Sequence, residues 1–113
     1  MDATSALLAL KALDGLDARA VVTAENIANA GTPGYRPMRV DFETALAQAA
    51  SRGPQAIAEV RPTTSLAPGA GADGLRLDLE MATASSTAMR YGALIEVLSR
   101  QMQLNALAVS GGR

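Results

Sequence analysis

Residues 77–110, LDLEMATASSTAMRYGALIEVLSRQMQLNALAVS, carry the longest regular pattern in the chain. Within them, a set of residues steps by three and four positions without a break, so its members would share one side of a helix. Asn105 is the only polar member, and the alternating spacing is that of the a and d positions of a coiled coil. At 1.5 Å per residue, this helix would be roughly 50 Å long. The set is Met81, Ala84, Ala88, Tyr91, Ile95, Leu98, Met102, Asn105 and Val109.

The only segment of the chain that could pair with so long a seam is the N-terminal one. A helix is predicted from about Thr4 to Asn29, although Gly15 weakens it, since a mid-helix glycine costs about 1 kcal/mol against alanine. Apolar residues at three- and four-residue spacings form one face of this helix. They are Leu13, Leu16, Ala20, Ala24 and Ile27.

Several residues predict how the two helices begin and end. Asn29 followed by Gly31 predicts a C-terminal cap with Gly31 left-handed, and residues 32–35 (TPGY) predict a type II turn. In the C-terminal helix, Asp78 is a plausible N-cap. Glu96 and Arg100 form a favourable pair one turn apart.

The middle of the chain shows little order in its sequence. Residues 40–50 could form a short helix opened by Asp41, and Val60 with its neighbours could form a short strand. Glycine and proline recur through residues 51–74, which predicts a mobile linker. Residues 69–74 (GAGADG) match the dinucleotide-binding fingerprint in letters alone, because no strand is predicted immediately before them.

These segments predict an all-α fold in which the N- and C-terminal helices pair as a coiled-coil-like hairpin, joined by a flexible, largely irregular middle. The parts are residues 1–34, 35–74 and 75–113 of one small domain. With 49% hydrophobic residues but only two Tyr, one Phe and no Trp, the chain has a thin predicted core. We therefore expect part of the helical seam to be buried between copies of the chain.

Composition excludes several classes of function. The 113 residues include no Cys and no His, which removes disulfides, Ser-His and Cys-His catalytic pairs and the commonest metal ligand. The net charge of −1 offers nothing that would attract nucleic acid. The acidic pairs Asp14/Asp17 and Asp41/Glu43 are expected on solvated surface. We expect no enzyme activity, no cofactor, no metal site, no membrane span and no secretory signal peptide.

Two segments carry a resemblance to a known family. Residues 26–35, NIANAGTPGY, resemble the N-terminal signature of flagellar axial proteins, which include rod and hook subunits. Residues 80–82 (EMA), 89–94 (MRYGAL) and 98–100 (LSR) are similar to the last helix of the proximal-rod subunits known as rod protein B. The motif residues are Asn26, Ile27, Ala28, Asn29, Thr32, Pro33, Gly34 and Tyr35.

The resemblance implies a structural subunit of the bacterial flagellar basal-body rod, a helical tube that transmits torque and is needed for motility. It implies self-association, contact with other rod proteins and the rod-base adaptor, and export into the periplasm by the flagellar type III apparatus without a cleaved signal. The expected assembly residues are Leu13, Leu16, Ala20, Ala24, Ile27, Met81, Ala88, Tyr91, Ile95, Leu98 and Met102.

Some alternatives stay open at the level of sequence. The chain could be another axial protein such as rod protein C, or a soluble helical export chaperone or adaptor. Asn26 could be solvated, or could satisfy backbone groups of the following turn or of a neighbouring subunit. Arg36 and Arg39 could pair with acidic groups of a neighbouring copy.

Overall fold

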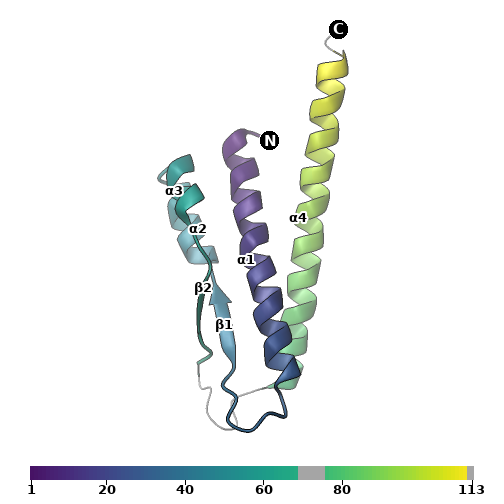
Figure 1. Ribbon diagram of the computed structural model, residues 1–113. Coiled ribbons are helices and arrows are strands. Elements are labelled where there is room, and N and C mark those ends of the chain that lie inside the picture. Colours follow the sequence, from purple (N-terminus) through teal and green to yellow (C-terminus); the bar gives the residue numbers. More distant parts are fainter. Residues whose placement is uncertain (69–75, 112–113) are drawn as a thin grey trace.

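The computed structural model describes residues 1–68 and 76–111, and this part of the chain is mostly helical (Figure 1). Two long helices stand at the ends of the sequence, and two short helices and a two-stranded sheet lie between them. In order, the elements are α1 (Ala3–Ala28), β1 (Met38–Asp41), α2 (Glu43–Ala50), α3 (Pro54–Glu59), β2 (Thr63–Leu66) and α4 (Leu77–Gly111).

Helix α1 stands in the middle of the molecule. Helix α4 runs along one side of it in the opposite direction, and the sheet with α2 and α3 covers the other side (Figure 1). The molecule measures 64 × 27 × 14 Å and is therefore strongly elongated. The pairing of the two terminal helices is as predicted, whereas the small sheet is an addition to the all-α expectation.

The middle of the chain is not the irregular linker predicted for residues 35–74. β1 and β2 pair in antiparallel register, with Met38 opposite Leu66 and Asp41 opposite Thr63. The predicted short helix is α2, but Phe42 rather than Asp41 precedes it. Elements of only four to eight residues show too little periodicity to be recognised in sequence. The GAGADG sequence and the end of the predicted linker, residues 69–74, lie outside the described residues.

Most of the core comes from this middle segment. Only one member of the buried apolar cluster belongs to a terminal helix, because the sheet and short helices fold their apolar sides against α1. The predicted strand around Val60 is wrong, since Val60 ends α3 and packs against the edge of the core. The cluster is Leu16, Val40, Phe42, Leu46, Ala49 and Ile57.

Gly15 of α1 allows Phe42 to approach the helix closely. A methyl group at Gly15 would lie 2.4 Å from two ring carbons of Phe42, which is far inside van der Waals contact. The Arg19 guanidinium, one turn later, lies 4.9 Å from the centre of the same ring, within the range of a cation–π interaction. Gly15 weakens the prediction of a helix, but it is the position at which Phe42 of the middle segment packs against α1.

The ends of α1 and the turn that follows are defined by short-range hydrogen bonds. Asp2 caps the N-terminus by accepting from the Ser5 amide at 2.7 Å, a cap the sequence analysis did not identify. The predicted turn over residues 32–35 forms, with the Tyr35 amide donating to the Thr32 carbonyl and Gly34 at φ +78°. The predicted left-handed Gly31 is wrong, because its φ is not positive.

Of two predicted features of α4, the N-cap is wrong and the ion pair is confirmed. Asp78 is not the N-cap, since it lies inside the first turn and pairs with Arg76 at 2.8 Å. Glu96 and Arg100 do form the predicted pair one turn apart, at 3.1 Å.

Candidate assembly surface

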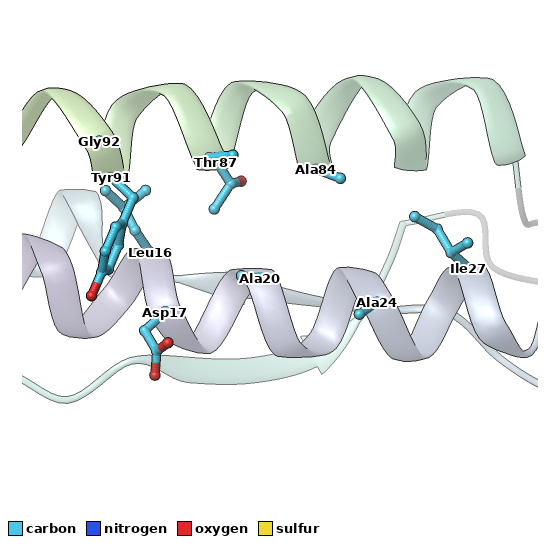
Figure 2. Close-up of a pocket in the computed structure, with 10 residues that line it drawn as sticks. Leu16, Asp17, Ala20, Ala24, Ile27, Ala84, Thr87, Tyr91 and Gly92 are labelled. Atoms are coloured by element: carbon cyan, nitrogen blue, oxygen red, sulfur yellow. The ribbon is translucent and has the colours of Figure 1, made fainter.

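An apolar groove runs between α1 and α4 and gathers six of the eleven expected assembly residues. It has a volume of about 490 Å³. Figure 2 shows Tyr91 reaching from α4 across to α1 beside Leu16, while smaller side chains leave the rest of the groove open. The six residues are Leu16, Ala20, Ala24, Ile27, Ala88 and Tyr91.

Small side chains make this groove. Ala20 and Ala24 on α1 face Ala84 and Ala88 on α4, and Gly92 closes one end of the row. Facing alanines leave space that neither helix fills, because an alanine methyl does not reach across to its partner helix. Asp17 is the one charged residue in the lining. The groove therefore suits an apolar side of another helix.

Helix α4 meets α1 through a different set of positions from the one predicted. The side of α4 that contacts α1 includes Ala84 and Leu98 of the predicted seam. It also includes two residues outside that seam, the buried Thr87 and the half-buried Leu94. These positions are shifted by one residue from Ala88 and Ile95. Helix α4 thus carries two overlapping seams, of which α1 covers only one.

The second seam is open to solvent along the whole helix. Ile95 is 42% exposed and Met102 is 70% exposed. Such large apolar side chains at heptad spacing are the usual contact positions of a further helix. The open seam consists of Met81, Ala88, Ile95, Met102 and Val109.

Two of the expected assembly residues are parts of the core of the single chain. Leu13 is buried, and Leu16 is 1% exposed and belongs to the core cluster. Leu16 also lines the groove. Both side chains are therefore buried within the single chain.

Asn26, in the motif at the end of α1, is the centre of a buried hydrogen-bond network. Its side chain is 1% exposed, and its amide nitrogen donates to the Met38 carbonyl at 2.8 Å and to a Glu80 carboxylate oxygen at 3.0 Å. Its amide oxygen accepts from the Tyr35 hydroxyl at 2.7 Å and the Met38 amide at 3.1 Å. Asn26 therefore satisfies backbone groups just after the turn and joins them to α4.

The other polar motif residues complete this corner. Asn29 donates to the Glu25 carbonyl and accepts from the Thr32 hydroxyl, so it ends α1 as expected. Partial burial raises the pKa of the Tyr35 hydroxyl, and the negative charges of Glu25 and Glu80 add to the rise. Tyr35 therefore stays protonated and can keep donating to Asn26.

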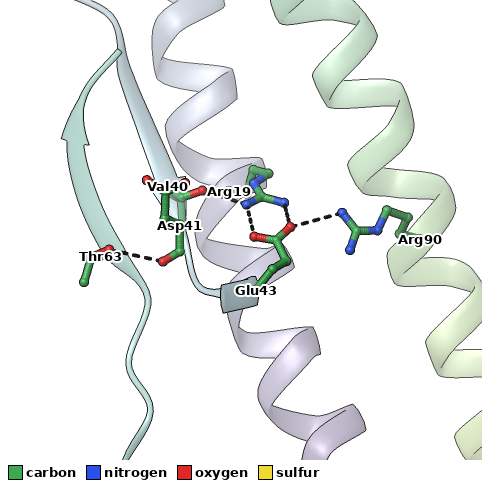
Figure 3. Close-up of polar contacts among 6 residues, drawn as sticks. All are labelled: Arg19, Val40, Asp41, Glu43, Thr63 and Arg90. Carbon is green, nitrogen blue, oxygen red and sulfur yellow. Dashed lines mark hydrogen bonds and ion pairs between the residues drawn. The ribbon is translucent and has the colours of Figure 1, made fainter. Parts of the chain in front are cut away.

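A second polar link, which the sequence analysis did not identify, joins three helices (Figure 3). Arg19 donates to both carboxylate oxygens of Glu43, at 2.6 and 2.7 Å, and to the Val40 carbonyl at 2.7 Å. Arg90 of α4 donates to the same carboxylate at 3.3 Å. The two-pronged Arg19–Glu43 pair has the strongest geometry available to these groups. This link could not be predicted from a local sequence pattern, because Arg19, Glu43 and Arg90 are far apart in sequence.

Acid should weaken this link. The hydrogen bonds from Arg19 lower the pKa of the Glu43 carboxyl from 4.5 to about 2, so its charged form stabilises the folded chain above pH 4.5. That stability is lost as the pH falls from about 4.5 towards 2. Because Glu43 is nearly half exposed, we expect a loss of about 1 kcal/mol. Urea unfolding at several pH values measures it, and Glu43→Gln should remove this part of the pH dependence. An unchanged slope in that variant would contradict the assignment.

The remaining ion pairs among the described residues lie within single elements or between close neighbours in sequence. Arg39, for which pairing with a neighbouring copy was one alternative, pairs with Asp41 at 3.1 Å within the chain. In residues 1–68 and 76–111, no three Asp or Glu side chains come together as metal ligands would. No helix in the same ranges combines the length and hydrophobicity that a membrane crossing requires.

Comparison with models of protein families finds no match for this chain, and neither does comparison with curated proteins.

Proposed function

We propose that this chain is a structural subunit of the proximal rod of the bacterial flagellar basal body, which polymerises into a helical tube that transmits torque. The proposal rests first on the resemblance of residues 26–35 and of the C-terminal helix to rod proteins. It agrees with the mostly helical fold and with the pairing of the N- and C-terminal helices. The proposed role is mechanical and involves no catalysis, cofactor or metal.

One structural observation supports this proposal most directly: the second seam of α4 is uncovered along a 35-residue helix. Isolated apolar side chains are ordinary on protein surfaces, but a continuous row at heptad spacing marks an interaction site. A catalytic domain would more typically present a closed pocket with converging polar groups. Here the groove between α1 and α4 is open and apolar, and four of its ten lining residues are alanine.

The proposed route of assembly follows from the same family resemblance. Subunits would pass through the flagellar type III export apparatus without a cleaved signal peptide and assemble in the periplasm. There they would join further copies, other rod proteins and the rod-base adaptor. The apolar stripes would be buried as each copy joins the growing tube.

Purified basal bodies provide the test of this role. We expect the chain to remain in them after washing in high salt, and to be located in the proximal rod by labelling and electron microscopy. A location elsewhere in the axis would favour another axial protein such as rod protein C. Recovery only in the wash would favour a soluble export chaperone or adaptor and contradict the proposal.

A substitution in the open seam should stop assembly without unfolding the chain. Ile95→Asp places a charge where a neighbouring helix would pack, and we expect loss of motility and of rods with normal protein levels. Ser99→Asp, one turn away on the same helix, is the matched control because Ser99 is exposed and outside the seam. Soft-agar swimming and micrographs of basal bodies measure both. Normal swimming of the Ile95→Asp strain would count against the proposal.

A further inference from the structure

The C-terminal end of α4 extends beyond the rest of the molecule. Figure 1 shows α4 continuing past the N-terminus of α1, so its last turns have no neighbour among the residues that the structure describes. Residues 101–111 carry no charged side chain, and Leu107 is 67% exposed. We call residues 104–111 the overhang. Its large apolar residues are Leu104, Leu107 and Val109.

The groove between α1 and α4 lies nearer the opposite end of the molecule. It reaches from Leu16 to Ile27 on α1, about 16 Å at 1.5 Å per residue. The overhang, at the same rise, is about 12 Å long and fits within that length. The side chains of the two surfaces are also complementary in size, because the groove contains small Ala side chains and the overhang carries the larger Leu and Val.

We propose that the overhang of one copy occupies the groove of the next copy, so that subunits join head to tail. This inference rests on the proposed function and names the partner of the same surface. The overhang cannot enter its own groove, because it points away from it at the far end of an elongated molecule. A second copy can supply a helix for the groove, and the open seam of α4 continues through Met102 into the overhang at Val109.

Such a joint uses two different surfaces, which determines the kind of assembly. A contact between unlike surfaces leaves a free groove at one end and a free overhang at the other, so growth continues instead of stopping at a dimer. Two turns of helix bury far less than the ~1,200 Å² of a stable standard interface. A single joint is therefore weak, and chains of subunits should form only at high concentration or beside neighbouring strands of the tube.

Cysteine cross-linking can test the joint cleanly, because the natural chain has no Cys. In the double variant Ala24→Cys/Leu107→Cys, one thiol lies in the groove and the other on the overhang. Mild oxidation of the concentrated protein should give a ladder of dimers, trimers and longer chains. The control Ala58→Cys/Leu107→Cys keeps the overhang thiol but moves the other to an exposed position on α3, and should give no ladder.

Single variants decide the polarity of the contact. A mixture of Ala24→Cys and Leu107→Cys proteins should form mixed dimers, whereas either protein alone should form few. Abundant dimers of the Leu107→Cys protein alone would instead show a two-fold contact between overhangs and overturn the proposal.

Filling the groove should block the joint. Ala88→Phe places a large side chain among the facing alanines, and we expect it to reduce the ladder roughly tenfold or more. Ser85→Phe is the matched control, because Ser85 is exposed on the same helix and does not line the groove. An undiminished ladder in the Ala88→Phe variant would contradict the groove as the docking site.

Experiments can distinguish failure of the proposed joint from failure of the proposed function. If the chain is present in rods but the Ala24/Leu107 pair does not cross-link in isolated basal bodies, the joint is wrong and the function stands. If the ladder forms in solution but the chain is absent from basal bodies, the function is wrong and the joint stands. Circular dichroism of every variant must match the parent, so that loss of the ladder is not caused by unfolding.

Discussion

Replacing Gly15 by alanine should destabilise the chain by about 2 kcal/mol, although alanine is the better helix former. In a free helix the change would stabilise by roughly 0.5–1 kcal/mol. Here the new methyl group would lie 2.4 Å from the Phe42 ring, so the ring must move out of the core. Overpacking of this kind costs about 1–3 kcal/mol or more. Urea unfolding followed by circular dichroism measures the net effect.

Gly92→Ala is the matched control for this prediction. Gly92 also lies inside a long helix, but nothing lies within 4 Å of a methyl group placed there. We expect that variant to be slightly more stable than the parent, by roughly 0.5–1 kcal/mol. Adding Phe42→Leu to Gly15→Ala should then cost less than the sum of the two single changes, because the smaller side chain leaves room for the methyl. Equal effects at Gly15 and Gly92 would contradict the close approach of Phe42.

Asn26→Asp should lower the stability of the fold by a similar amount, although it only replaces the amide NH₂ group by an oxygen. The new carboxylate keeps the oxygen that accepts from Tyr35 and Met38 but loses the nitrogen that donates to the Met38 carbonyl and to Glu80. It also places a negative charge beside Glu80 in a buried position. Leaving a buried acceptor without its donor lowers the free energy of unfolding by about 1–3 kcal/mol, and repulsion between the two negative charges adds to this loss. We expect a loss of about 3 kcal/mol at neutral pH.

The effect of Asn26→Asp should shrink in acid, since the introduced carboxyl group, once protonated, could again donate a hydrogen bond and would carry no charge. Asn29→Asp is the control, because the same chemical change falls three residues later at a more exposed site. We expect a loss below about 1 kcal/mol there. Thermal unfolding between about pH 4 and pH 7, near the range where most proteins are stable, compares the two variants. Equal losses at both positions would show that Asn26 has no special role.

The sequence says more about Asn26 than about Gly15. Asn26 belongs to a recognisable motif, and satisfying the backbone after the turn is one of the roles that the motif allows. Gly15 appeared only as a weakness in a helix. The partner that explains it, Phe42, comes from another part of the chain, and contacts between distant residues leave no local pattern in a single sequence.

The middle segment shows the same limit on a larger scale. Gly53 and Pro62 lie between its short elements and Pro68 follows the last of them, and such residues favour turns over long regular structure. Gly53, with φ +108°, and Pro54 form the turn between α2 and α3 rather than a loose linker. Packing against α1 stabilises these elements, because helices this short are marginal in isolation.

The sequence by itself determined both terminal helices, the turn at residues 32–35 and the Glu96–Arg100 pair, because each depends on residues within a few positions of one another. Only the tertiary structure decided which side of α4 meets α1. Alanine-rich spacing fits two seams one residue apart, and local propensity does not distinguish them. Long-range links from Asn26 to Glu80 and from Glu43 to Arg90 favour the observed side. The other seam is left exposed, and the proposed assembly depends on it.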